Sequence, residues 1–200
     1  MGQQPDRLDS VCVFCGSSDA AAPELLSAAA ELGRSLAAAD LTMIYGGGGV
    51  GLMGACAMAA HAAGGKVLGI IPHFLKEKER RLDVVETIVV DSMHERKMIM
   101  FERSDGFVVL PGGIGTLEEI VELLSWRRLD LHVKPVVFYS PGGFWEPLFK
   151  LFQHTVDHKL TPSSFMQSWV SVDRVEDIIP ALRGAQPAGP DAAPAAANLT

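Results

Sequence analysis

The stretch LTMIYGGGGVGLMGACAMAAHAAGGKVLGII, residues 41 to 71, decides the fold of this chain. It opens with Leu41–Tyr45, a mostly apolar run with the length of a buried strand, and a glycine loop follows at Gly46–Gly51. An alanine-rich helix is expected next, to about Ala63, where two glycines end it, and Lys66–Ile71 provides a second apolar run. A strand, a helix and a strand in this order predict one unit of a parallel sheet.

The same alternation continues on both sides of this unit. Further strands are expected at Val11–Phe14, Val84–Val90, Gly106–Leu110 and Pro135–Tyr139, with a short one at Trp169–Val172. Helices are expected from Pro23 onward, at Asp91–Ser104, after Pro111–Thr116, at Phe144–Asp157 and at Val175–Arg183. The sequence therefore predicts the α/β class, as a single doubly wound, Rossmann-like parallel sheet with helices on both faces. In such a fold the ligand site lies at the carboxyl ends of the strands.

Length and composition fit one globular domain. The chain has 200 residues, of which 48% are hydrophobic and 20% charged, and a domain typically holds about 150 residues. We expect a flexible N-terminus at 1–9, one Rossmann-like domain at 10–183, and a disordered tail at 184–200, where alanine and proline are frequent.

Charge and hydropathy argue against two classes of partner. Seventeen Lys and Arg against 24 Asp and Glu give a net charge of −7, a poor match for the polyanionic backbone of nucleic acid. A small phosphorylated ligand is still compatible, because one local cationic pocket can hold it. No apolar run reaches the ~18 residues that a transmembrane helix needs, so we expect no membrane contact.

The cysteines indicate cytoplasmic residence. There are 3 of them, an odd number, and the chain starts without a hydrophobic signal core, so a disulfide framework is not expected. Cys12 and Cys15 form a C-x-x-C pair, for which a redox role and a packing role are both open. The apolar pattern of Val11–Phe14 favours packing.

Three loops that follow predicted strands have unusual compositions: Cys15–Ser18, Gly46–Gly51 and Pro111–Thr116. Glycine-rich loops let backbone N–H groups approach a ligand, and the following helix directs its positive end at the same point. Gly46–Gly51 also matches the dinucleotide pattern G-x-G-x-x-G, but the next strand ends without the acidic residue that would bind a ribose. Two such loops in one chain favour a phosphate ligand. For Gly46–Gly51 alone, a tight turn that needs positive φ angles is the alternative.

Basic side chains occupy the first turn of the third predicted helix. His94, Arg96 and Lys97 place positive charge where it opposes the helix dipole, at a cost of about 0.3 to 1 kcal/mol each. A solvated turn stabilised by a Ser92-x-x-Glu95 capping box would tolerate them. An anion receptor explains better why the local rule is broken.

Glu119 stands in the first turn of the helix predicted after Pro111–Thr116. It completes a Thr116-x-x-Glu119 capping box, and an acid is stabilising at a helix N-terminus. A carboxylate beside a phosphate loop also repels the ligand, so a catalytic role is the competing interpretation.

Other polar and aromatic residues fit structural roles. The histidines show no metal-binding spacing apart from His154 and His158, an i, i+4 pair for which a surface or core role is expected. Glu118 and Glu122 share a helix face and are expected to face solvent. Packing roles are expected for the three tryptophans, Trp126, Trp145 and Trp169. No metal ion and no cofactor are predicted.

Three stretches together resemble the Lonely Guy family of cytokinin-activating phosphoribohydrolases: YGGGGVGLMG at 45–54, SMHERK at 92–97 and PGGIGTLEE at 111–119. The glycine run is weakly specific, whereas P-G-G-x-G-T-x-x-E after an R-K pair is strongly specific, and the resemblance spans about Val11 to Arg183. It implies a catalytic domain that hydrolyses the N-glycosidic bond of N6-substituted adenosine 5′-monophosphates, giving the free base and ribose 5-phosphate, commonly as a homodimer. The family also carries a lysine-decarboxylase label, for which these residues offer no chemical support.

The resemblance assigns roles to particular residues. Arg96 and Glu119 match the catalytic pair, and Gly112–Thr116 would hold the 5′-phosphate with Lys97 nearby. Gly49 departs from the family, which usually has serine there. The implied substrate-binding positions are Ser17, Gly47, Glu79, Met93, Arg96, Lys97, Gly112, Gly113, Ile114, Gly115, Thr116, Glu118 and Ser125, of which Glu79 is assigned to the base without a motif around it.

These roles agree with the chemistry. Breaking a ribosyl C–N bond builds positive charge on the sugar, which Glu119 can stabilise while it orients or deprotonates water. Arg96 can keep Glu119 ionised and fix the ribose or phosphate. The alternative is a carrier of the same fold that binds a phosphorylated ligand, such as molybdenum cofactor, without turnover, and a nicotinamide enzyme is the third interpretation.

Overall fold

The structure is a computed structural model that describes residues 8–76 and 80–184. Its strands are β1 (Ser10–Phe14), β2 (Thr42–Tyr45), β3 (Val67–Pro72), β4 (Glu86–Val90), β5 (Gly106–Val109), β6 (Val136–Tyr139) and β7 (Val170–Val172). Its α-helices are α1 (Pro23–Ala38), α2 (Gly51–Ala62), α3 (Met93–Glu102), α4 (Ile114–Arg128), α5 (Glu146–Asp157) and α6 (Ile178–Gly184). Short 3-10 helices occupy His73–Leu75, Pro141–Gly143, Ser163–Gln167 and Val175–Asp177.

The strands form one parallel sheet in the order β4-β3-β2-β1-β5-β6-β7. From the central β1, the chain first builds the sheet outward through β2, β3 and β4, and then returns to add β5 on the other side. The predicted α/β class is therefore confirmed. At such a reversal, the connections from the carboxyl ends of the two central strands diverge and leave a crevice between them.

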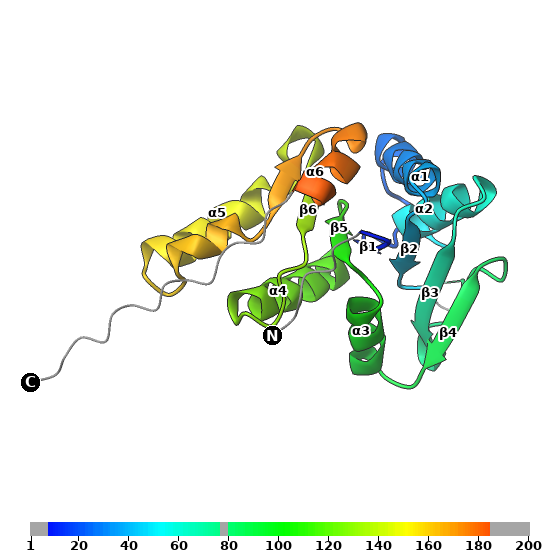
Figure 1. Cartoon of the computed structure of the whole chain (residues 1–200), viewed down its shortest axis with the longest axis horizontal. Coiled ribbons are helices and arrows are strands. Elements are labelled where there is room, and N and C mark those ends of the chain that lie inside the picture. Colours follow the sequence, from blue (N-terminus) through cyan, green and yellow to red (C-terminus); the bar gives the residue numbers. More distant parts are fainter. Residues whose placement is uncertain (1–7, 77–79, 185–200) are drawn as a thin grey trace, which may run out of the picture.

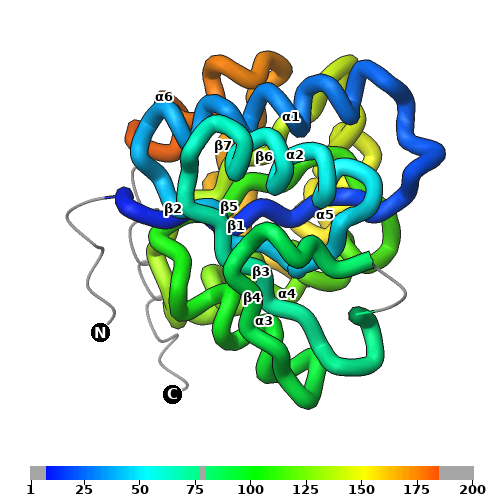
Figure 2. The backbone as a smooth tube through the Cα atoms, turned by 90° about the vertical axis from the view of Figure 1, so that its right-hand side faces the viewer, coloured from blue at the N-terminus to red at the C-terminus, as the bar shows by residue number. Residues whose placement is uncertain are grey.

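Helices cover both faces of the sheet (Figures 1 and 2). α1, α2 and α6 pack on one face, and α3, α4 and α5 on the other. Side chains of β1 alternate between the two cores, because successive residues of a strand point to opposite faces. Val11 and Val13 enter the first core, and Cys12 and Phe14 the second.

The C-x-x-C pair is split between these cores. Cys12 packs among the residues under α3 and α4, while Cys15 packs in the core under α1 and α2. Burial raises the pKa of the Cys12 thiol well above its ordinary value, which keeps it protonated and unreactive. The arrangement favours the packing role over the redox role.

Several predicted boundaries were wrong. α4 begins at Ile114, with Gly113 as an N-cap that has no side-chain hydrogen bond, so Thr116 lies inside the helix and does not cap it. Gly113 takes the required extended conformation without a capping hydroxyl, so a start marked by Thr116 lies too late. β4 is shorter than predicted, and the last helical segment is divided into a 3-10 turn and α6.

The ends of the predicted domain are only partly described. Asp9 and Ser10 donate backbone hydrogen bonds to Asp105 Oδ2, at 3.0 and 2.9 Å, which ties the start of β1 to the loop before β5. Residues 1–7 and the predicted disordered tail from 185 onward lie outside the described residues. Among the described helices, none has the length and apolar character needed to cross a membrane.

Candidate active site

A pocket of about 400 Å³ opens in the crevice at the carboxyl ends of β1 and β5. It is built from the loop after β1, the start of the glycine run after β2, one face of α3 and the first turns of α4. Its walls are formed by Val13, Phe14, Cys15, Gly16, Ser17, Ser18, Gly46, Met53, Leu75, Met93, Arg96, Met100, Gly113, Ile114, Gly115, Thr116, Glu118 and Glu119. The three loops singled out by composition therefore converge on one cavity.

Arg96 projects from the first turn of α3 into this pocket. Ser92 caps the helix by accepting a hydrogen bond from the Glu95 N–H at 3.1 Å, as the capping-box pattern predicts. The Arg96 side chain is only 5% exposed, and its Nη2 donates to the Gly46 carbonyl at 3.1 Å. A Cβ on Gly46 would lie 1.9 Å from that nitrogen, so Arg96 can occupy this position only because residue 46 is glycine.

Much of the glycine run is required by packing. Gly47 and Gly51 have φ angles of +79° and +56°, a conformation that favours glycine. A Cβ on Gly51 would also lie 2.6 Å from the backbone of Ser17 and Ser18. The tight-turn interpretation of this loop is therefore correct for these positions, and the run alone is weak evidence for a ligand.

At the N-terminus of α4, unlike in the glycine run, packing does not require the glycines. A Cβ on Gly113 or Gly115 would meet nothing within 4 Å. The first intrahelical bond runs from the Leu117 N–H to the Gly113 carbonyl at 3.0 Å, so the N–H groups of Ile114, Gly115 and Thr116 have no partner within the helix. These glycines leave open space where a helix N-terminus presents its N–H groups, which is the arrangement that binds anions.

Glu119 lies in the second turn of α4, not the first, because the helix starts earlier than predicted. It lines the same pocket as Arg96. After burial, the Glu119 charge is the strongest influence that raises the pKa of Cys12, while the Arg96 charge lowers it. Both charges therefore lie close to the thiol beneath the pocket floor, and a carboxylate and a guanidinium face one cavity.

Lys97 is turned away from the pocket walls. Its ammonium donates to Glu118 at 2.6 Å and forms an ion pair with Glu122 at 2.7 Å, and the lysine side chain is 15% exposed. Desolvation opposes the charged form, but the bonds to Glu118 and Glu122 outweigh it and raise the pKa of Lys97. Glu118 is exposed, as predicted, and Glu122 is partly exposed, but both also pair with Lys97, which the sequence did not predict.

Asp19, in the loop after β1, makes contacts with two other segments. The Asp19 carboxylate accepts a hydrogen bond from the Gly51 N–H at 3.0 Å and pairs with Arg80. The bond from Gly51, followed by the charge of Arg80, lowers the pKa of Asp19. Asp19 thus links the loop after β1 to the start of α2 and to the segment that returns toward β4.

The residues implied by the family resemblance are placed as follows. Nine line the pocket: Ser17, Met93, Arg96, Gly113, Ile114, Gly115, Thr116, Glu118 and Glu119. Four lie outside its walls, namely Gly47, Lys97, Gly112 and Ser125. Glu79 lies outside the described residues. The sequence reasoning missed the apolar wall of Phe14, Met53, Leu75 and Met100, because apolar residues of strands and helices give the same pattern whether they fill a core or line a cavity.

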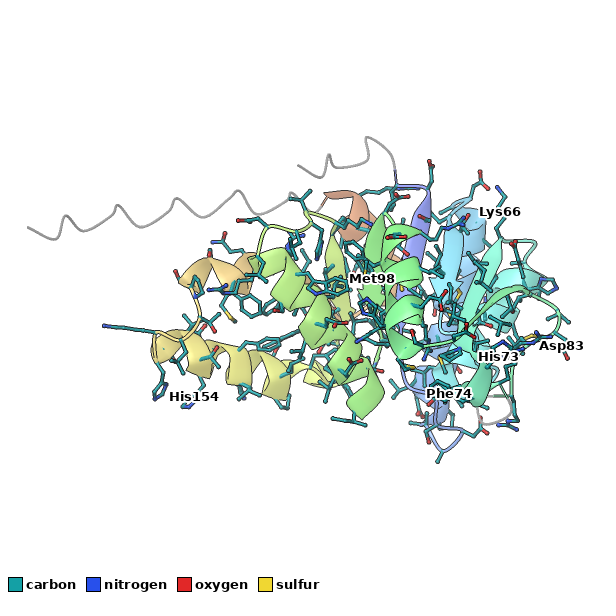
Figure 3. The ribbon with its side chains drawn as sticks, turned by 90° about the horizontal axis from the view of Figure 1, so that it is seen from below. Lys66, His73, Phe74, Asp83, Met98 and His154 are labelled. Atoms are coloured by element: carbon teal, nitrogen blue, oxygen red, sulfur yellow. The ribbon has the colours of Figure 1, made fainter. Side chains whose placement is uncertain are left out.

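The histidines give no sign of a metal centre. The rings of His154 and His158 are tilted by 50° to each other with centroids 4.1 Å apart, and His154 lies at the opposite end of the molecule from His73 (Figure 3). Within the described ranges, no group of three or more His, Cys, Asp or Glu is placed to hold a metal ion. The surface role expected for His154 and His158 agrees with their exposure.

Comparison with known proteins identifies the family. Residues 53–182 match the family model described as "Possible lysine decarboxylase". The chain is 42% identical over 187 residues to the probable cytokinin riboside 5′-monophosphate phosphoribohydrolase LOGL9 of Oryza sativa subsp. japonica, covering 90% of this chain and 82% of that protein. It is 40% identical over 182 residues to the cytokinin riboside 5′-monophosphate phosphoribohydrolase LOG5 of Arabidopsis thaliana, covering 90% and 80%. The chain belongs to the Lonely Guy family.

Solved structures extend the likeness at the level of the fold. The molybdenum cofactor carrier protein of Chlamydomonas reinhardtii superimposes with a TM-score of 0.67 at 25% identity, covering 88% of this chain and 97% of that one. The molybdenum cofactor binding protein of Rippkaea orientalis gives a TM-score of 0.64 at 23% identity, covering 90% and 98%. These values show that this chain shares its fold with the two molybdenum cofactor proteins.

One departure from the Lonely Guy pattern has a steric cause in this chain. At Gly49, where the family usually has serine, a Cβ would lie 2.3 Å from the Arg80 carbonyl oxygen and 2.9 Å from Leu82 Cδ2. The segment that returns toward β4 therefore lies directly on the glycine run, and only glycine fits beneath it.

Proposed function

We propose that this protein hydrolyses the N-glycosidic bond of N6-substituted adenosine 5′-monophosphates, giving the free cytokinin-type base and ribose 5-phosphate. The observation that carries the proposal is that Arg96, Glu119 and the open N-terminus of α4 all border one pocket. An anion site, a carboxylate and a guanidinium are the groups that this reaction needs. Relatives about 40% identical over most of the chain bear the name of this activity.

The phosphate would bind at the N-terminus of α4. The N–H groups of Ile114, Gly115 and Thr116 and the positive end of the helix dipole would hold it, with Gly112 and Gly113 forming the approach. Gly113 and Gly115 leave the necessary space. Ser17, in the loop after β1, lines the same cavity.

The ribose would then lie between Arg96 and Glu119. In the hydrolysis, the oxygen of water bonds to C1′ while the C1′–N9 bond breaks. The electron pair of the C1′–N9 bond leaves with the purine, which takes up a proton. Glu119 stabilises the positive charge that develops on the sugar and accepts the proton of the attacking water. Arg96, buried and anchored to Gly46, would orient the sugar phosphate and pair with the developing negative charge.

The apolar wall suits the base and its substituent. Met93, Met100, Phe14 and Leu75 line the cavity, and flexible methionine side chains adapt to apolar groups of different shapes. A polar contact to the purine is assigned to Glu79 by the family resemblance alone.

A carrier that binds a phosphorylated ligand without turnover is the competing function, and the shared fold with molybdenum cofactor proteins favours it. The two functions differ in what they require of Glu119. A carrier gains nothing from a carboxylate beside its anion site, whereas a hydrolase depends on it.

The test is to incubate the purified protein with AMP and with N6-isopentenyl-AMP and to measure free base and ribose 5-phosphate by chromatography. Glu119→Gln should lower base release by about 10²- to 10⁴-fold while nucleotide binding persists. Glu86→Gln, at an exposed position on β4, is the matched control and should behave as wild type. Wild-type protein that binds both nucleotides but releases no base would establish the carrier instead.

We also propose a cytoplasmic homodimer. Cys12 and Cys56 are buried without a disulfide, in keeping with a reducing compartment. Ile114 and Val121 are 84% and 46% exposed on one face of α4, and Ser125 is exposed on the same face. A second copy of the chain packed against this face would cover the two apolar side chains and contact Ser125. Light scattering should give twice the chain mass, and a monomer at micromolar concentration would refute the dimer.

A further inference from the structure

Lys97 has an unusual position for a cation next to an anion-binding pocket. It follows Arg96 directly on α3, yet it does not line the cavity. Its ammonium is instead held by two carboxylates of another helix, at 2.6 Å from Glu118 and 2.7 Å from Glu122. The two carboxylates offset the positive charge of Lys97, so its attraction for a phosphate is weak.

The two helices that Lys97 connects belong to different parts of the sheet. α3 packs mainly against β3 and β4, whereas α4 packs against β1. Their own positions are therefore set by separate strands, although they lie on the same face of the sheet (Figure 1). Arg96 belongs to the first unit and Glu119 to the second, so the distance between these two side chains depends on how the helices are held relative to each other.

The two glutamates that pair with Lys97 lie on either side of Glu119 in the sequence. Glu118 precedes it in sequence, and Glu122 lies three residues later on the same helix, about one turn away. The lysine side chain is 15% exposed, Glu122 is 33% exposed and Glu118 is 52% exposed, so water screens the pair with Glu122 less than the pair with Glu118. The contact thus fixes the turn of α4 that carries Glu119 against the turn of α3 that carries Arg96.

We propose that Lys97 is a positioning residue that bridges α3 and α4 and sets the geometry of Arg96 and Glu119, and that it is not a ligand of the substrate phosphate. This inference rests on the proposed hydrolase function. Its consequence is that the chemical step depends on Glu122, which does not line the pocket.

The variant Glu122→Gln distinguishes a positioning role of Lys97 from phosphate binding by Lys97, because the two roles predict different kinetic changes. A bridge weakened by the loss of one carboxylate should lower kcat for N6-isopentenyl-AMP about five- to tenfold and change KM less than twofold. If Lys97 is a phosphate ligand, the same change frees its ammonium, and KM should fall or stay constant with kcat unchanged. An unchanged or increased kcat/KM for Glu122→Gln would overturn the proposal.

Lys97→Met extends the test to the lysine itself. We expect kcat to fall about tenfold to one-hundredfold, with the preference for the 5′-monophosphate over the corresponding nucleoside retained, and Lys97→Arg should recover part of the lost kcat. A loss confined to the nucleotide, with the nucleoside hydrolysed as by wild type, would assign Lys97 to the phosphate. Lys66→Met is the control for removal of one positive charge, because Lys66 is exposed and makes only a 3.8 Å pair with Asp40.

The design keeps the two proposals separate. Wild-type protein that releases no base refutes the hydrolase function, whereas an active wild type with a fully active Glu122→Gln refutes only the role of Lys97. Should Lys97→Met fail to fold, as followed by circular dichroism, Glu122→Gln still decides the question, because Glu118 continues to pair with the lysine.

Discussion

The contact between Gly46 and Arg96 allows the guanidinium to be displaced without removing it. In Gly46→Ala the new methyl group would lie 1.9 Å from Arg96 Nη2 and 3.0 Å from Cζ. The atoms in the way belong to the end of a flexible side chain, so Arg96 can retreat while the backbone stays in place. We therefore expect a large loss of activity and only a small loss of stability, because the guanidinium can turn into the pocket and bond to water in place of the Gly46 carbonyl.

The size of the effect follows from the bond that is lost. A hydrogen bond from a charged donor contributes about 1.5 to 3 kcal/mol, and each ~1.4 kcal/mol corresponds to a factor of ten in rate. If the Arg96–Gly46 bond serves to hold the guanidinium for catalysis, kcat/KM should fall roughly tenfold to one-hundredfold.

Gly33→Ala provides the opposite case. A Cβ on Gly33 would lie 2.2 Å from the Cys56 carbonyl oxygen and 2.9 Å from the Ala60 nitrogen, both in the backbone of α2. Neither helix can yield cheaply there, and overpacking typically costs about 1 to 3 kcal/mol. This variant should be destabilised while its folded fraction keeps wild-type kcat/KM, because Gly33 does not line the pocket.

The assay combines base release from N6-isopentenyl-AMP with urea unfolding of both variants. The expected pattern is an active but unstable Gly33→Ala and a stable but impaired Gly46→Ala. A kcat/KM within twofold of wild type for Gly46→Ala would refute the reasoning, because it would mean that the position of Arg96 against Gly46 is not needed for the reaction.

Two further predictions concern stability. Gly49→Ser, which restores the residue usual in the family, should destabilise the protein by about 1 to 3 kcal/mol in urea unfolding, because its Cβ would lie 2.3 Å from the Arg80 carbonyl oxygen; equal or greater stability would contradict this. Burial lowers the pKa of His132 to about 4, and its Nε2 donates to the Leu123 carbonyl at 3.0 Å, so the ring is neutral in the folded protein. Between its ordinary pKa of about 6.5 and pH 4, the unfolded chain binds a proton that the folded chain does not, so stability should fall by up to about 3 kcal/mol as the pH drops through that range. His132→Phe should flatten this slope in unfolding titrations, and an unchanged slope would assign it to other groups.

The order of strands and helices could be predicted from the sequence because its signals are local. Apolar runs separated by glycine and proline loops fix where strands and helices lie, as at Leu41–Tyr45 and the glycines that follow. Helix starts were less certain. α4 begins at Ile114 because Gly113 adopts the N-cap conformation without a capping side chain, which no hydroxyl pattern reveals.

The components of the candidate site were also present in local sequence. Glycine loops after strands and cations in the first turn of α3 each strain a local rule, an acid stands near the start of α4 beside such a loop, and together these features match one family. Apolar residues such as Phe14 and Met100 gave no such signal, because their contribution is to line a cavity that exists only after β1, α3 and α4 have come together.

The sequence by itself determined the α/β class, the anion-binding loops and the family of this protein, because each depends on residues close together in the chain. Only the tertiary structure decided what each residue touches. It placed the Arg96 guanidinium against the Gly46 carbonyl and paired Lys97 with Glu118 and Glu122 outside the pocket lining. It also packed the Arg80 carbonyl against Gly49, which leaves no room for a side chain there. These contacts join residues that are 21 to 50 positions apart, or elements that share no local pattern, so the packing of the helices and loops about the sheet is what creates them.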